Sequence, residues 1–214
     1  MTLAMERALF AQGYRCVAGL DEVGRGAWAG PLAAAAVLVT PKHLPSCRRL
    51  RPLVRDSKTL SRKQRENAYV AIARVLPWGV GFVSAGELDR IGMTLANQLA
   101  LDRAIAAVTR RPELLLVDGR GFHFRLPHRE LIDGDARVFC IAAAAIIAKV
   151  TRDRLMAERF HPRYPAYGFH HHNGYGTAAH QTALNAYGPC PCHRRSFRPV
   201  AQCRGPRPPR QAHG

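Results

Sequence analysis

Four acidic residues lie where carboxylates could converge on a cation. Asp21 and Glu22 are adjacent and end an apolar stretch, Asp118 follows a second apolar run, and Asp135 follows a glycine. Hard divalent ions such as Mg²⁺ or Mn²⁺ prefer oxygen ligands, and a two-metal site for phosphodiester hydrolysis needs carboxylates that leave positions open for water and phosphate. Acids near turns also cap the backbone or meet solvent, so the pattern alone leaves both interpretations open.

A glycine-rich turn, Gly24-Arg25-Gly26, follows the first acidic pair. Neighbouring strand residues point to opposite faces, so Asp21 and Glu22 can share a site only where the strand ends and twists into this turn. The glycines would let a ligand approach the main chain, with Arg25 and backbone N–H groups available for phosphate. Together these features indicate nuclease-like chemistry.

Strands and helices alternate along the chain. The two segments that flank the glycine turn are expected to pair as antiparallel strands. A continuous apolar run that ends at Asp118 is expected to be a buried central strand. The predicted strands span residues 15–21, 31–40, 79–84 and 113–117.

Helices are expected between and after these strands. A polar loop over 41–60 leads to a capping box, Ser61-Arg62-Lys63-Gln64, which begins the first long helix. An alanine-rich run from Val138 to about Arg159 predicts a helix that packs closely on the sheet. Apolar spacing predicts a further long helix whose buried stripe consists of Leu95, Leu99, Ile105 and Val108.

Composition favours a polyanionic partner. The chain has 214 residues and 47% hydrophobic content, enough for the core of one domain. Its 32 Lys and Arg against 15 Asp and Glu give a net charge of +17, which predicts attraction to nucleic acid, with a membrane surface as the rival partner.

The sequence predicts a soluble, cytoplasmic protein. Residues 1–12 lack the pattern of a signal peptide, and the longest apolar run, 138–148, is too short to span a bilayer. The six cysteines are interpreted as thiols in a reducing cytosol. Cys190-Pro191-Cys192-His193 suggests zinc, but the spacing is not that of known zinc fingers and no second ligand pair answers it, so plain thiols are preferred.

Several motifs, in order, resemble those of the ribonuclease HII family. The match covers roughly residues 14 to 200, and coincidence is a poor explanation for so many ordered motifs. The matching segments are DEVGRG (21–26), DSK (56–58), VDG (117–119), GD (134–135), AAAAIIAKVTRD (142–153), GYGT (174–177) and HRRSF (193–197).

The resemblance implies an α/β fold, a ribonuclease H-like mixed sheet flanked by helices with a small helical C-terminal region. Residues 1–200 would form the catalytic domain, with the helical part starting at about 160, and 201–214 a disordered basic tail. The implied activity is hydrolysis of the RNA strand of RNA–DNA hybrids, and of single ribonucleotides embedded in duplex DNA, leaving 3′-hydroxyl and 5′-phosphate ends. Selectivity must come from the 2′-hydroxyl.

The resemblance also assigns roles to individual residues. The four acids would be catalytic and would bind Mn²⁺ or Mg²⁺, while Asp153 is a less favoured ligand that more plausibly joins Arg152 in a structural salt bridge. The glycine turn would read the 2′-hydroxyl, an aromatic ring would stack on the neighbouring deoxyribose, and two lysines would contact phosphate. These substrate-binding residues are Gly24, Arg25, Gly26, Tyr175, Lys58 and Lys149.

The chain departs from the family pattern at a few positions and leaves alternatives open. Ala145 replaces a serine, His171 and Asn173 stand where lysines are common, and Trp28 is read as a packing change. The histidine run 170–172 is expected to be an exposed loop. Ribonuclease HIII, which usually carries an extra N-terminal domain, and a catalytically silent hybrid-binding protein are the alternatives. A monomer, with possible recruitment by a replication clamp, is expected.

Overall fold

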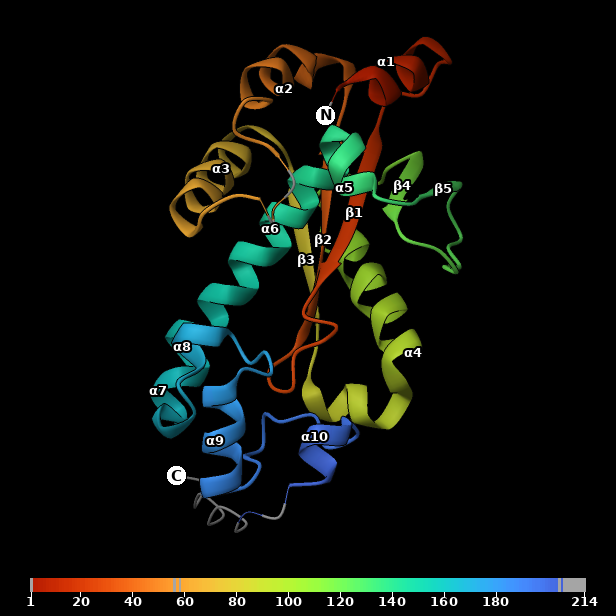
Figure 1. Ribbon diagram of the computed structural model, residues 1–214. Coiled ribbons are helices and arrows are strands. Elements are labelled where there is room, and N and C mark those ends of the chain that lie inside the picture. Colours follow the sequence, from red (N-terminus) through yellow and green to blue (C-terminus); the bar gives the residue numbers. More distant parts are fainter. Residues whose placement is uncertain (1, 56, 58, 204, 206–214) are drawn as a thin grey trace. The chain divides into compact units, whose positions relative to one another are not determined.

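The computed structural model describes residues 2–55, 57, 59–203 and 205 (Figure 1). The chain forms two compact units, each built from three segments. Unit 1 consists of Met1–Val23, Ala33–Phe82 and Asn97–Thr151. Unit 2 consists of Gly24–Leu32, Val83–Ala96 and Arg152–Gly214.

A mixed sheet of five strands lies in order β3-β2-β1-β4-β5 (Figure 1). β1 and β2 pair antiparallel, as the sequence predicts, while β4 runs parallel to β1 and to β5. The edge strand β5 was not expected, because its residues are polar and only partly buried. The strands are β1 (Val17–Val23), β2 (Leu32–Val39), β3 (Trp78–Val83), β4 (Leu114–Asp118) and β5 (His128–Leu131).

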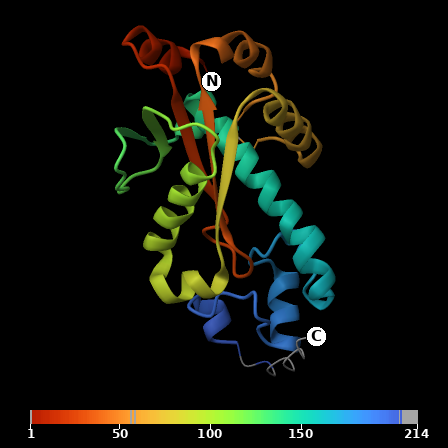
Figure 2. The same ribbon diagram turned by 180° about the vertical axis from the view of Figure 1, so that it is seen from behind.

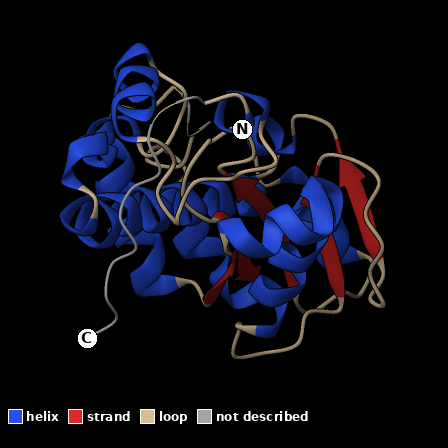
Figure 3. Ribbon diagram, turned by 90° about the horizontal axis from the view of Figure 1, so that it is seen from below, coloured by secondary structure: helices blue, strands red, loops and turns tan. Residues whose placement is uncertain are grey.

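Helices cover both faces of the sheet (Figure 3). On one face, α6 (Phe139–Leu155) crosses β1 so closely that a Cβ at Gly19 would overlap the main chain of Cys140. The alanine-rich part of α6 is fully buried there, which confirms the close packing expected from its small residues. The same face carries α1 (Ala4–Ala11), α2 (Leu44–Leu50) and α3 (Arg62–Val75), whose buried residues join one apolar core.

The helices near the start of the chain partly match the predictions. The capping box of α3 is present, because Ser61 Oγ accepts from the Gln64 N–H at 3.3 Å and Gln64 Oε1 accepts from the Ser61 N–H at 2.8 Å. The predicted polar loop over 41–60 was wrong in part. It contains a 3-10 turn, Pro41–His43, and α2, whose buried Cys47 and Leu50 anchor it.

The helix α4 (Ala85–Ala106) has a kink at Gly92, and its part from Asn97 onward packs on the opposite face with a stripe that differs from the predicted one (Figure 2). Leu95 is 61% exposed, whereas Ala96, Ala100 and Ala104 are fully buried. A Cβ at Gly81 of β3 would overlap the carbonyl of Ala100, so the backbones approach closely and only alanine fits between them. Leu88 and Leu101 are also fully buried, so the buried side combines these alanines with leucines that the predicted stripe did not include.

Unit 2 contains short helices from the end of the chain. The predicted helix over 138–159 corresponds to α6 and a π-helical turn, Met156–Phe160, that follows it. The later elements are α7 (His161–Arg163), a 3-10 turn (Pro165–Tyr167), α8 (Phe169–His172), α9 (Ala178–Tyr187) and α10 (Arg198–Ala201). The histidine run 170–172 therefore belongs to α8 and is not a loop.

Among the described residues, no helix is both long and apolar enough to cross a membrane. The predicted disordered tail falls mostly on residues 204 and 206–214, which lie outside the described part of the chain.

Candidate active site

Three carboxylates converge in unit 1. Asp21, Asp118 and Asp135 each offer an oxygen, and these oxygens lie within 4.8 Å of one another. Asp21 and Asp118 follow the paired residues Leu20 and Val117 on the adjacent parallel strands β1 and β4, so they stand at the same level of the sheet. The third acid is in the short helix α5 (Gly134–Arg137) directly after β5. This cluster contains three of the four predicted acids.

The alternation of strand side chains explains why Glu22 stands apart. Val17 faces the α6 side of the sheet, so Asp21, four residues on, shares that side. β1 continues to Val23, so the prediction that the strand ends at Asp21 was wrong. The same alternation places Glu22 on the other face, and Glu22 is not in the cluster that the described residues form. Its N–H donates to Asp21 Oδ1 at 2.7 Å.

The backbone before α5 fixes Asp118. The Gly134 N–H donates to Asp118 Oδ1 at 2.7 Å. A Cβ at Gly134 would come within 2.7 Å of Ile141 Cδ1, so a side chain there would require the Ile141 side chain to shift. Asp133 has a φ of +53°, the left-handed region that aspartate and asparagine tolerate best. The turn thereby brings Asp135, which is 5% exposed, to the strand ends.

Charge repulsion makes the cluster suited to a cation. Burial raises the pKa of Asp21 well above its ordinary value of 3.8, and the charges of Glu22, Asp118 and Asp135 raise it further. The folded chain therefore holds the Asp21 proton more tightly than the unfolded chain does. The site lowers stability progressively as pH rises above the ordinary value. A bound divalent cation would offset this repulsion, and the cluster is compatible with one.

Replacing Asp118 by asparagine should relieve this strain. We expect Asp118→Asn to raise the melting temperature in chelator by an amount that corresponds to about 1 kcal/mol, because one charge beside Asp21 is removed. The asparagine Oδ1 can still accept from the Gly134 N–H. Added magnesium should stabilise the wild type more than the variant, since an ion that binds only the folded state shifts the equilibrium.

Melting curves in chelator and in magnesium check this expectation. If the variant melts lower in chelator and responds to magnesium as the wild type does, the three acids do not share a site.

The glycine turn lies in unit 2, and the physical reason for glycine differs between its positions 24 and 26. Gly24 has a φ of +89°, and a Cβ there would overlap the Arg152 side chain. Gly26 has no such constraint, because a Cβ there would meet no described heavy atom within 4 Å. Folding does not explain the missing side chain of Gly26. Open space beside a bare main chain is what a closely approaching ligand requires.

Two buried arginines support this turn, and sequence reasoning did not assign them that role. Arg152 donates from Nε to the Pro31 carbonyl at 2.8 Å, from Nη1 to that of Asn173 at 3.0 Å and from Nη2 to that of Ala29 at 3.1 Å. Burial lowers its pKa. These three bonds give Arg152 a role in main-chain support, and the salt bridge expected for it stays a prediction.

Arg194 supports the same segment from another direction. It donates from Nε to the Gly30 carbonyl at 3.1 Å and from Nη1 to the Arg25 carbonyl at 3.0 Å. Burial and the nearby charge of Arg152 lower its pKa to about 9. The HRRSF motif indicated its importance, but only the fold shows which carbonyls it holds.

Tyr175 lies half-buried beside the glycine turn. It forms an antiparallel bridge with Ala27, and the Arg152 guanidinium lies 5.3 Å from the centre of its ring. Trp28 packs against Gly176, where a Cβ would overlap its indole ring, and against His180. The Trp28 departure is therefore a packing change.

The remaining predicted residues are placed as follows. Lys149 is half-buried on α6, and Lys58 lies outside the described residues. Asp153 does not join the cluster of three acids among the described residues. Asn173 has a φ of +51°, a left-handed conformation that suits asparagine better than lysine. Ala145 is buried in α6.

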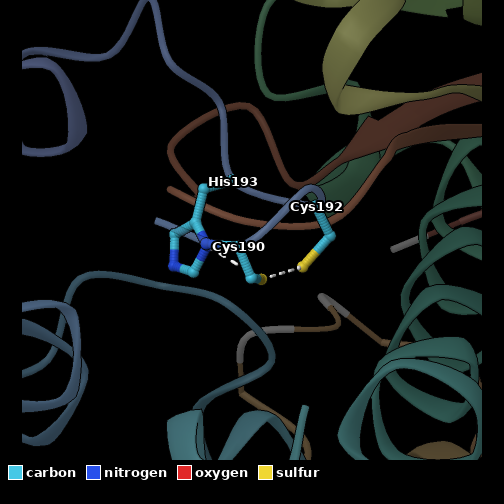
Figure 4. Close-up of side chains that lie close together, drawn as sticks. All are labelled: Cys190, Cys192 and His193. Atoms are coloured by element: carbon cyan, nitrogen blue, oxygen red, sulfur yellow. Dashed lines mark hydrogen bonds between the residues drawn. The ribbon is translucent and has the colours of Figure 1, made fainter. Parts of the chain in front are cut away.

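A second cluster of possible ligands consists of Cys190, Cys192 and His193, all buried in unit 2 (Figure 4). The two sulfurs lie 3.2 Å apart, and Cys190 Sγ lies 3.1 Å from His193 Nδ1. All six cysteines are free thiols. The fold thus brings one possible ligand atom from each of the two cysteines and the histidine of this motif within 4.8 Å of the others.

Comparison with known proteins identifies the family of this chain. The family model for ribonuclease HII matches residues 18–200. The chain is 47% identical over 206 residues to the ribonuclease HII of Chloroflexus aggregans, covering 94% of each chain.

Solved structures give the same result. The ribonuclease H2 of Pyrococcus horikoshii matches with a TM-score of 0.73 and 26% identity, covering 88% of this chain and 96% of that one. The ribonuclease HII of Archaeoglobus fulgidus, solved in complex with PCNA, matches with a TM-score of 0.71 and 27% identity, covering 85% and 94%. The mixed sheet is thus of the ribonuclease H type, and type HIII is not favoured. The chain belongs to the ribonuclease HII family, endoribonucleases that cleave the RNA of RNA–DNA hybrids.

Proposed function

We propose that Asp21, Asp118 and Asp135, with Glu22 beside them, hold Mg²⁺ or Mn²⁺ and that this site cleaves both RNA–DNA hybrids and single ribonucleotides embedded in duplex DNA. The observation that carries the proposal is the convergence of three carboxylates within 4.8 Å at the ends of two adjacent strands. Divalent ions bound there would stabilise charge on the scissile phosphate.

The chain's own groups divide the remaining work. Backbone N–H groups orient two of the acids, because the Gly134 N–H donates to Asp118 and the Glu22 N–H donates to Asp21. Burial and the neighbouring acids raise the pKa of the Asp21 carboxyl, and a bound cation would favour its ionised form. Half-buried Glu22, next to Asp21 on β1, would help to hold the cation. Hydrolysis would leave 3′-hydroxyl and 5′-phosphate ends.

The main chain of Gly24, Arg25 and Gly26 would recognise the 2′-hydroxyl, the one group that distinguishes RNA from DNA at a given position. The open space at Gly26 and the two arginines that hold this segment support that role. Tyr175 would stack on the deoxyribose beyond the ribonucleotide, and Lys149 and Lys58 would contact phosphate.

Magnesium-dependent nicking of a duplex that carries one ribonucleotide tests the proposal, with a continuous RNA–DNA hybrid as the second substrate. We expect cleavage of both and none of an all-DNA duplex. Binding of the hybrid without any cleavage would instead support a catalytically silent hybrid-binding protein, in which the net charge of +17 supplies the affinity.

Substitution of Tyr175 tests the recognition of the RNA–DNA junction. We expect Tyr175→Ala to lose roughly tenfold more activity on a duplex with one embedded ribonucleotide than on a continuous hybrid, the scale of one lost stacking contact. The reason is that a stack on the next sugar has its partner only when that sugar is DNA. Equal losses on both substrates would show that Tyr175 only supports the fold.

The cellular setting follows from the same substrate. We propose a monomeric enzyme of the cytoplasm whose residues 1–200 act as one catalytic domain and whose basic tail, 201–214, adds nonspecific affinity for nucleic acid. Recruitment by a replication clamp is supported by the PCNA complex of the Archaeoglobus fulgidus relative. Chromatography of the purified chain with and without a clamp protein tests both the monomer and the recruitment.

A further inference from the structure

Two fully buried histidines connect the Cys190 turn to the main chain of Tyr175. His180 is 0% exposed and His193 is 2% exposed, and their Nε2 atoms lie 3.0 Å apart. His193 Nδ1 lies 3.0 Å from the Cys190 backbone nitrogen, and His180 Nδ1 lies 2.9 Å from the Tyr175 carbonyl oxygen. We call this series of three hydrogen bonds the histidine relay. Figure 4 shows its first residues.

The backbone fixes the direction of every bond in the histidine relay. The Cys190 N–H can only donate, so His193 Nδ1 must accept and carries no proton. His193 therefore bears its proton on Nε2 and donates it to His180 Nε2. His180 then bears its proton on Nδ1 and donates to the Tyr175 carbonyl. Both imidazoles are neutral, with one tautomer each.

The environment supports the neutral form of His180. Burial lowers the pKa of His180 to about 4. Both ring nitrogens of His193 and both of His180 have protein partners, so this pair is satisfied without any cation. A proton added to His180 would place two N–H groups face to face at the central contact, and one added to His193 would place its Nδ1–H against the Cys190 N–H.

We propose that the histidine relay holds Tyr175 in the position that junction recognition requires, and that His180 and His193 are positioning residues for substrate selectivity. The inference rests on the recognition role proposed for Tyr175. The Tyr175 carbonyl accepts from His180 and from the Thr177 N–H, the latter at 2.9 Å. The Tyr175 N–H donates to the His172 carbonyl at 2.9 Å. The histidine relay supplies the one side-chain anchor among these bonds.

Imidazole nitrogen resonances test the histidine relay directly and without reference to activity. We expect NMR of ¹⁵N-labelled full-length protein at neutral pH to show His193 protonated on Nε2 and His180 protonated on Nδ1. The opposite tautomer at either residue would overturn the inference while leaving the proposed function intact.

Two variants of His180 separate positioning from simple packing. His180→Asn keeps an amide N–H near the place of Nδ1 and can still donate to the Tyr175 carbonyl. His180→Gln moves its amide beyond that place and loses the bond. We expect His180→Gln to lower the ratio of embedded-ribonucleotide to hybrid cleavage roughly fivefold, the scale of one net hydrogen bond, and His180→Asn to keep the ratio near that of the wild type.

The matched control is His123→Asn, which changes an exposed histidine in unit 1. A purely structural role for His180 would lower both activities together in both variants and leave the ratio unchanged, which would overturn the inference. If Tyr175→Ala itself leaves the ratio unchanged, the recognition role proposed for Tyr175 fails instead, and the two failures are thereby distinguished.

Discussion

Asp118→Asn should reduce cleavage of an RNA–DNA hybrid on the order of 10³-fold, the scale on which a preorganised electrostatic group contributes to catalysis. The substitution removes one of three converging carboxylates while preserving side-chain shape and the Oδ1 acceptor for the Gly134 N–H. Binding of the hybrid should persist, because affinity comes from a basic surface that the change does not alter.

Single-turnover cleavage and equilibrium binding, measured on the same hybrid in magnesium, check this result. Asp133→Asn is the matched control. Asp133 loses the same charge two residues from Asp135, is exposed, and has a φ of +53° that asparagine adopts easily. A variant at position 118 that cleaves at a rate near that of the Asp133→Asn control would remove Asp118 from the catalytic set.

The sequence predicts the strands well where apolar runs meet a sharp boundary. Four of the five strands lie within about two residues of their predicted bounds, because most of them are apolar runs bounded by glycine, proline, acidic or hydroxyl residues. Asp21 and Asp118 could be predicted to meet for that reason. Asp135 could not, since its position depends on β5, a polar edge strand with no apolar pattern, and on the left-handed Asp133.

Side-chain direction and close approach are harder to predict. Glu22 was grouped with Asp21 on the expectation that β1 ends there, whereas β1 continues to Val23 and Glu22 lies outside the cluster of three acids that the described residues form. The stripe of α4 was assigned to Leu95, Leu99, Ile105 and Val108, whereas glycines in β3 bring the helix so near that alanines fill much of the contact. The error on α4 comes from a contact between segments distant in sequence, which periodicity within one segment does not record.

The buried arginines show the same limit and lead to a test of the glycine turn. Its position inside a predicted helix indicated a structural salt bridge for Arg152, and did not indicate that its guanidinium donates to the carbonyls of Ala29, Pro31 and Asn173. The three acceptors lie in two segments far apart in sequence. A single planar group with a fixed fork of donors therefore ties the segment after the glycine turn to the segment before Tyr175.

Arg152→Lys should lower the free energy of unfolding by about 2–4 kcal/mol, because an ammonium group cannot reach all three carbonyls and a buried acceptor without a partner costs roughly 1–3 kcal/mol. The Trp28 and Gly30 amides, which donate to Gly174 and Cys192, should exchange with deuterium faster as the segment loosens. The rate of cleavage at an embedded ribonucleotide should also fall, since this segment carries the proposed 2′-hydroxyl contact.

Urea unfolding, amide exchange and nicking of a duplex with one ribonucleotide measure the three effects. Arg159→Lys makes the same chemical change at an exposed position of the π-helical turn and should alter none of them. Should Arg152→Lys behave like that control in all three measurements, the main chain of the glycine turn does not depend on the buried guanidinium. Its geometry would then have to come from the glycines, from Arg194 and from the bridge between Ala27 and Tyr175.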